Sequence, residues 1–70
     1  MMYHDKTRSL LTNLNRFDLV GIAISGVPKT PYKIYAERYG SESELLTVAW
    51  FETEQEAITE LEYIKKEMNK

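Results

Sequence analysis

The chain has 70 residues, a formal net charge of −2 and no cysteine. We expect a single domain over residues 1–70, because a chain this short buries only ~60 % of its unfolded surface and cannot support two cores. The lack of cysteine excludes disulfides and thiolate metal sites and is compatible with a cytoplasmic protein. No apolar run approaches the ~18 residues of a membrane span, so a membrane is not an expected partner.

Charge is divided unevenly between the two halves of the sequence. Residues 1–35 carry five basic and two acidic side chains, whereas residues 36–70 carry four basic and nine acidic ones. Such a division indicates either an acidic interaction face or one solvated acidic helix. Both interpretations agree with the sequence.

A short N-terminal helix is predicted over residues 5–17, with Asp5 as its N-cap. The apolar side chains that fall on one side of it at helical spacing are Tyr3, Leu10, Leu11, Leu14 and Phe17. Asn13 and Asn15 are poor helix formers, so we expect the helix to fray at its C-terminal end.

Three strands are predicted to follow this helix. Alternating apolar side chains indicate strands at residues 19–25 and 32–39. Residues 26–31 form a loop between them, because two prolines and a glycine cannot sustain a strand ladder. After a polar connection at residues 40–44, a third strand at residues 45–51 carries apolar side chains on both of its faces.

The C-terminal segment is predicted to form an amphipathic helix. Thr53 and Glu56 have capping-box spacing, so the Thr53 hydroxyl can accept from the Glu56 amide and the Glu56 carboxylate can reach back to the Thr53 amide. The apolar stripe of this helix consists of Ala57, Ile58, Leu61, Ile64 and Met68. The predicted fold class is therefore α+β, a helix–three-stranded antiparallel sheet–helix (αβββα) with both helices on one face of the sheet.

The assignment of the two faces of the third strand determines which side chains remain uncovered once the helices pack on the sheet. We assign Leu46, Val48 and Trp50 to its inner face. The other face of the sheet then carries a predicted interaction face of Leu19, Ala23, Tyr35, Tyr39, Leu45, Ala49 and Phe51. That set is too apolar for a sheet face in water, and covering even ~400 Å² of it is worth on the order of 10 kcal/mol before association costs. We therefore predict a small non-enzymatic interaction or regulatory protein that forms a homodimer, or binds another protein, through this face.

Residues suited to catalysis or metal binding are few. His4 is the only histidine, and neither a cysteine nor a second histidine can complete a zinc site with it. The serines lack a base to activate them, and most glutamates are expected on the exposed side of one helix, where they make poor general acids. Three scattered glycines build no phosphate-binding loop. We expect no enzymatic activity, no cofactor and no metal ion.

Nucleic-acid binding through the same sheet face is the alternative function. The aromatic and basic side chains that could stack bases and contact phosphates are Tyr35, Tyr39, Phe51, Lys29, Lys33 and Arg38. The helix–three strands–helix order resembles the double-stranded-RNA-binding domain, and residues 51–57 are similar to arm-type DNA-binding modules of integrases. Both families are basic where this chain reads Thr-Glu-Gln-Glu-Ala at residues 53–57, and acidic side chains there repel phosphate.

The C-terminal helix offers a further interaction surface. An acidic ridge of Glu56, Glu60, Tyr63 and Glu67 is predicted to lie away from the apolar stripe. Such a ridge could dock a basic protein surface or imitate a phosphate backbone, or its glutamates could serve solubility alone.

Overall fold

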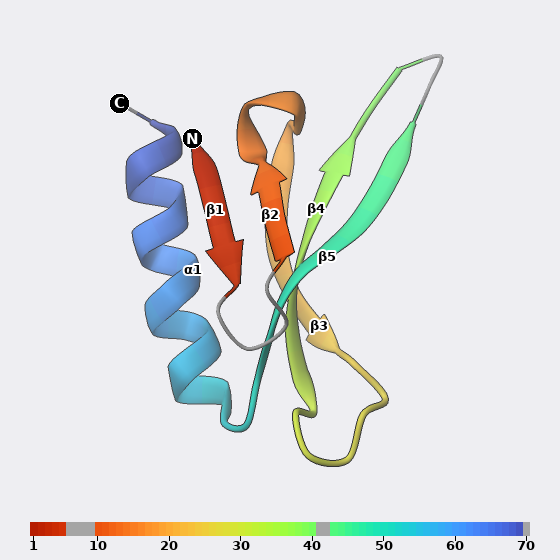
Figure 1. Ribbon diagram of the computed structural model, residues 1–70, viewed down its shortest axis with the longest axis vertical. Helices are drawn as coiled ribbons and strands as arrows, with labels where there is room; N and C mark the ends of the chain where they lie inside the picture. Colours follow the sequence, from red (N-terminus) through yellow and green to blue (C-terminus); the bar gives the residue numbers. More distant parts are fainter. Residues whose placement is uncertain (6–9, 41–42, 70) are drawn as a thin grey trace.

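The computed structural model describes residues 1–5, 10–40 and 43–69. Within them the chain forms, in order, β1 (Met2–Asp5), β2 (Leu10–Asn13), the 3-10 turn η1 (Leu14–Arg16), β3 (Leu19–Ile24), β4 (Tyr32–Arg38), β5 (Glu44–Phe51) and α1 (Glu54–Met68), as Figure 1 shows. β1 and β2 form a two-stranded antiparallel sheet, and β3, β4 and β5 form a three-stranded antiparallel sheet with β4 at its centre. The predicted α+β class and three-stranded sheet are confirmed.

The predicted helix over residues 5–17 is wrong. Tyr3 pairs with Thr12, so this part of the chain is a β-hairpin rather than a helix. Tyr3, Asp5 and Thr12 are buried while Met2, His4, Leu11 and Asn13 are exposed, which is the period of a strand with one face on the core. Residues 6–9 of the predicted helix lie outside the described residues.

Among the described residues 10–17, a single turn of helix forms, at η1. The Asn13 side chain accepts a hydrogen bond from the Asn15 amide at 3.1 Å, a local bond that competes with a longer helix. The helix–three strands–helix order on which the resemblance to the double-stranded-RNA-binding domain depended is therefore not the order of the described elements.

The C-terminal helix is confirmed, and its N-terminus has the predicted cap. The Glu56 amide donates to Thr53 Oγ1 at 3.2 Å. The Glu56 carboxylate accepts from the Thr53 hydroxyl at 2.9 Å, rather than from the Thr53 amide as predicted. Ala57 and Ile64 of the predicted apolar stripe are buried. Glu54 and Glu56 lie in the first turn, where the helix dipole favours negative charge.

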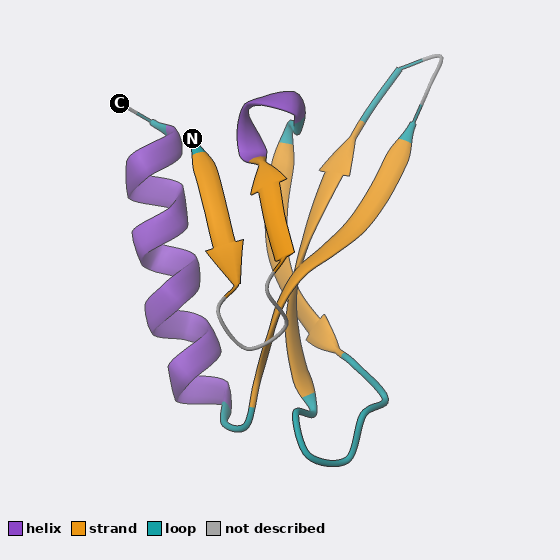
Figure 2. Ribbon diagram, viewed as in Figure 1, coloured by secondary structure: helices purple, strands orange, loops and turns teal. Residues whose placement is uncertain are grey.

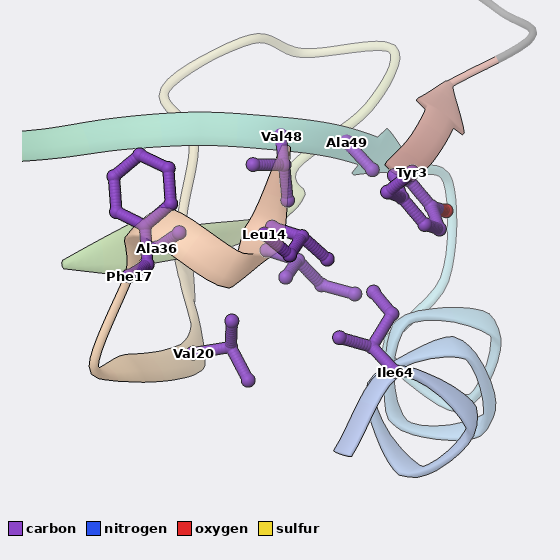
Figure 3. Packing of buried hydrophobic residues seen from close by; sticks show 9 residues of the cluster. Tyr3, Leu14, Phe17, Val20, Ala36, Val48, Ala49 and Ile64 are labelled. Atoms are coloured by element: carbon purple, nitrogen blue, oxygen red, sulfur yellow. The ribbon is translucent and has the colours of Figure 1, made fainter. Parts of the chain in front are cut away.

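The hairpin β1–β2 and α1 cover one face of the three-stranded sheet (Figures 1 and 2). The hairpin thus takes the place that a second helix was predicted to fill. The buried apolar side chains between these layers are Tyr3, Leu14, Phe17, Val20, Ile34, Ala36, Val48, Ala49 and Ile64. Leu14 stands in the middle of this core, between side chains from the sheet and Ile64 of α1 (Figure 3).

A β-bulge in β5 decides which of its side chains reach the core. Ile34 pairs with Ala49, but the next residue of β4, Tyr35, pairs with Thr47, which leaves Val48 as an extra residue. Val48 and Ala49 are both buried although they are neighbours in the strand. Each residue after the bulge therefore points to the side of the sheet opposite to the one that continued two-residue alternation would give it.

The bulge corrects the predicted faces of β5. Val48 lies inside as predicted. Trp50 pairs with Lys33, so the register places it on the face away from the core, and it also borders a hollow lined by residues of β1 and α1. Ala49 is buried, and Phe51 packs against the core from the same side of the sheet. The placement of Ala49 and Phe51 on the uncovered face is therefore wrong, because the prediction assumed an unbroken two-residue period through residue 51.

Candidate interaction face

The face of the three-stranded sheet opposite the core is the candidate functional surface, here called the open face. Directly opposed residues of neighbouring strands point to the same side, so the register defines its members. They are Leu19, Gly21 and Ala23 of β3, Lys33, Tyr35 and Glu37 of β4, and Leu45, Thr47 and Trp50 of β5. The elements that pack on the sheet in the described part of the chain, α1 and the β1–β2 hairpin, lie over its other side (Figure 2).

Large apolar side chains on the open face are accessible. Leu45 is 67 % exposed and Leu19 is 39 % exposed, while Tyr35 and Trp50 are partly exposed. Of the predicted interaction face, the register retains the four residues Leu19, Ala23, Tyr35 and Leu45. Tyr39 follows the end of β4 and is also exposed.

Sequence reasoning missed Trp50 and Thr47 as members of this face. The bulge that places Trp50 on this face depends on pairing with β4, so no local signal identifies that residue. Thr47 precedes the bulge and lies on the face of Leu45 by simple alternation. Lys33 and Glu37 share this face with Tyr35.

The centre of the open face is flattened by a tyrosine lying on a glycine. A Cβ atom at Gly21 would stand 2.6 Å from Tyr35 Oη and 2.7 Å from Tyr35 Cζ, so only glycine lets the ring lie across β3 without moving. Aromatic side chains commonly cover a cross-strand glycine in this way. The result is a low central surface, with Leu45 standing clear of it on the neighbouring strand.

The acidic ridge is partly engaged inside the molecule. Glu60 is half-buried and accepts a hydrogen bond from the Tyr3 hydroxyl at 2.9 Å, which ties β1 to α1. Glu56 belongs to the helix cap. Tyr63 is half exposed, and Glu67 is partly buried. The ridge therefore presents less free negative charge than the sequence alone suggested.

The predicted chemistry-bearing residues do not form a site. His4 is exposed on β1 and borders a hollow of about 390 Å³ that Asp5, Glu52 and Glu60 also line. Among the described residues, no group of three or more histidine, cysteine, aspartate or glutamate side chains is placed to hold a metal ion. Ser25 bonds the Thr30 carbonyl oxygen and the Val27 amide, which is a loop-closing role.

Loss of the Tyr3 hydroxyl is expected to reduce stability and to change its dependence on pH. Desolvation by burial, followed by the hydrogen bond to Glu60, raises the pKa of Tyr3 far above its ordinary value of 10.0. The folded state therefore holds this proton more tightly than the unfolded state does. Its contribution is fully present below pH ~10 and is lost as the pH rises further. We expect Tyr3→Phe to lower the free energy of unfolding by about 1 kcal/mol at pH 7.

Urea unfolding at pH 7 and at pH 10.5 measures both effects. The wild-type protein should lose stability between these pH values by more than the Tyr3→Phe variant does. Equal losses in the two proteins would show that Tyr3 is not a group that links stability to alkaline pH.

None of the protein-family models, curated proteins and solved structures compared with this chain matches it. In the described residues, no helix combines the length and the apolar composition needed to cross a membrane.

Proposed function

We propose that this protein is a small non-enzymatic interaction protein of the cytoplasm that forms a homodimer through its open face. The observation that carries the proposal is the exposure of Leu45 and Leu19 beside Tyr35 and Trp50, on a sheet face that no described element covers. A one-sided antiparallel sheet normally presents polar side chains to water. A second copy is the simplest cover, because a homodimer needs no other gene product and its interface is the same patch on both subunits.

The expected affinity is moderate. Covering roughly 400 Å² of apolar surface contributes on the order of 10 kcal/mol, and the loss of rotational and translational freedom opposes it with several kcal/mol. With the smallest such cost, about 4 kcal/mol, the net is about 6 kcal/mol, which corresponds to a dissociation constant of tens of micromolar. Mass must therefore be measured across a dilution series rather than at one concentration.

Sedimentation equilibrium from about 1 μM to 500 μM tests the proposal. The 8.2 kDa chain should approach twice that mass at the upper end. Leu45→Glu should raise the dissociation constant at least about 100-fold, because it places a charge in an apolar interface. A wild-type protein with the mass of one chain at every concentration would refute the homodimer.

Leu11→Glu is the matched control for Leu45→Glu. Leu11 is 64 % exposed, nearly the same as Leu45, but it lies on the β1–β2 hairpin, which covers the other side of the sheet. The two variants add the same charge at equally exposed leucines. An equal effect of both on the dissociation constant would show that association does not involve the open face.

The same samples distinguish nucleic-acid binding from the homodimer. On the open face Lys33 is balanced by Glu37, so the face gives phosphate no net attraction. A nucleic-acid binder would remain monomeric and would bind a single-stranded oligonucleotide with an affinity that falls steeply as salt is added. That result would replace the homodimer by the alternative function.

A further inference from the structure

Opposite charges flank the central aromatic side chain of the open face. Along β4, Lys33, Tyr35 and Glu37 point to the same side, with Tyr35 in the middle. The two charged residues are four positions apart, which is about 13 Å along a strand, too far for a direct ion pair. Among the described residues, neither forms an ion pair with another residue. On the open face, β4 thus carries a positive side chain on one side of Tyr35 and a negative side chain on the other.

From this arrangement we propose that two copies pack open face to open face with their β4 strands antiparallel. The two-fold axis that relates them lies between the two faces, runs perpendicular to the strands and passes over Tyr35. This inference rests on the proposed homodimer. Rotation about such an axis reverses the direction of β4, so Lys33 of each copy faces the partner's Glu37. The alternative two-fold axis, parallel to the strands, would place Lys33 against the partner's Lys33. Charge complementarity therefore selects the axis that crosses the strands.

The flanking strands fit the same axis. Leu19 pairs with Glu37 in the register, and Ala23 pairs with Lys33, so the rotation sets Leu19 against the partner's Ala23. A large side chain then meets a small one, as interdigitated sheet faces require.

β5 is matched in the same way. Leu45 pairs with Glu37, and Trp50 pairs with Lys33, so Leu45 is set against the partner's Trp50. The most exposed leucine of the open face is thereby covered by an aromatic ring. The Tyr35 ring lies across Gly21, so the surface at the axis is low. Two such faces can approach to the ~10 Å that separates packed sheets.

Charge reversal tests the orientation. Lys33→Glu and Glu37→Lys each create two like-charge contacts across the proposed axis, and each should raise the dissociation constant at least tenfold. The double variant Lys33→Glu/Glu37→Lys restores both attractive pairs, and its dissociation constant should return to within about threefold of the wild-type value. The readout is sedimentation equilibrium at low salt, with circular dichroism to establish that each variant is folded.

Lys29→Glu is the control for net charge. Lys29 is exposed in the loop between β3 and β4, away from the strands of the open face, and its reversal changes the net charge by the same amount as Lys33→Glu. It should leave the dissociation constant unchanged. If Lys29→Glu weakens the dimer as much as Lys33→Glu does, the effect is general repulsion and the orientation is refuted.

The outcomes separate the orientation from the proposed function. If Leu45→Glu dissociates the dimer but Lys33→Glu does not, or the double variant stays as weak as the single ones, the face is right and the orientation is wrong. If the wild-type protein has the mass of one chain at all concentrations, the proposed function fails and the orientation with it. If Glu37→Lys fails to fold, the double variant is expected to fail as well. Glu37→Gln then replaces both, and its dissociation constant should rise severalfold; no rise refutes the orientation.

Discussion

Truncation of Leu14 to alanine is expected to remove about half of the stability of this protein. Leu14 is fully buried where the hairpin, the sheet and α1 meet (Figure 3), so its loss leaves a cavity that no single element can close. Leucine-to-alanine changes in cores cost about 2–5 kcal/mol. A domain of this length has a total of roughly 4–10 kcal/mol. Leu14→Ala should therefore remove about half of the free energy of unfolding at 25 °C.

Urea unfolding followed by circular dichroism measures this loss. The protein concentration must be the same for every variant, because self-association adds to apparent stability. Leu11→Ala is the control, since an exposed leucine on the adjoining strand should change the free energy of unfolding by no more than about 0.5 kcal/mol. Similar midpoints for Leu14→Ala and Leu11→Ala would show that Leu14 is not at the centre of the core.

Phe51→Glu is expected to destabilise the fold rather than to dissociate a folded dimer. The bulge at Val48 turns Phe51 toward the core, where it packs against the buried cluster. A carboxylate there loses the apolar contacts of the ring and is partly desolvated, which together cost about 3 kcal/mol. Without the bulge, Phe51 would lie on the open face and the same change would act on association alone.

Thermal unfolding and sedimentation of Phe51→Glu and Leu45→Glu, measured side by side, distinguish these two cases. Both residues belong to β5, but Leu45 precedes the bulge and Phe51 follows it. Leu45→Glu should keep a melting midpoint close to that of the wild-type monomer and lose the dimer. A Phe51→Glu protein that keeps its melting midpoint and loses the dimer would place Phe51 on the open face and contradict the register.

The C-terminal helix could be predicted because its signals are local. Thr53 and Glu56 are three residues apart, and the cap they form depends on no other part of the chain. Ala57 and Ile64 are buried at the spacing of one helical face. The strand at residues 32–39 was also predicted closely, since the alternation that ends at Ala36 is unbroken.

The N-terminal segment could not be predicted, because a coincidence of spacing favoured a helix. Leu10, Leu11 and Leu14 fall at helical intervals, yet Leu10 and Leu11 are exposed and only Leu14 is buried. The pairing of Tyr3 with Thr12 that decides the outcome is a contact between two short strands. Propensity within either strand is too weak to reveal it.

The prediction of which β5 side chains face the core was partly wrong for a different reason. Both sides of this strand are apolar, so Trp50 and Phe51 suit the core equally well by composition. A polar face would have fixed the register, as it does in a strand with one side in water. The open face was therefore predicted correctly before the bulge, at Leu45, and incorrectly after it, at Ala49 and Phe51.

The bond between the Tyr3 hydroxyl and Glu60 joins positions 57 residues apart. A ribosome releases the N-terminus first, so β1 emerges long before the helix that it contacts. The core around Leu14 cannot close until Ile64 has been synthesised, so this fold is completed only after α1 has emerged. Until then Leu14 and the other core side chains already synthesised remain exposed to water. At that stage of synthesis the chain is most accessible to chaperones and most prone to aggregation.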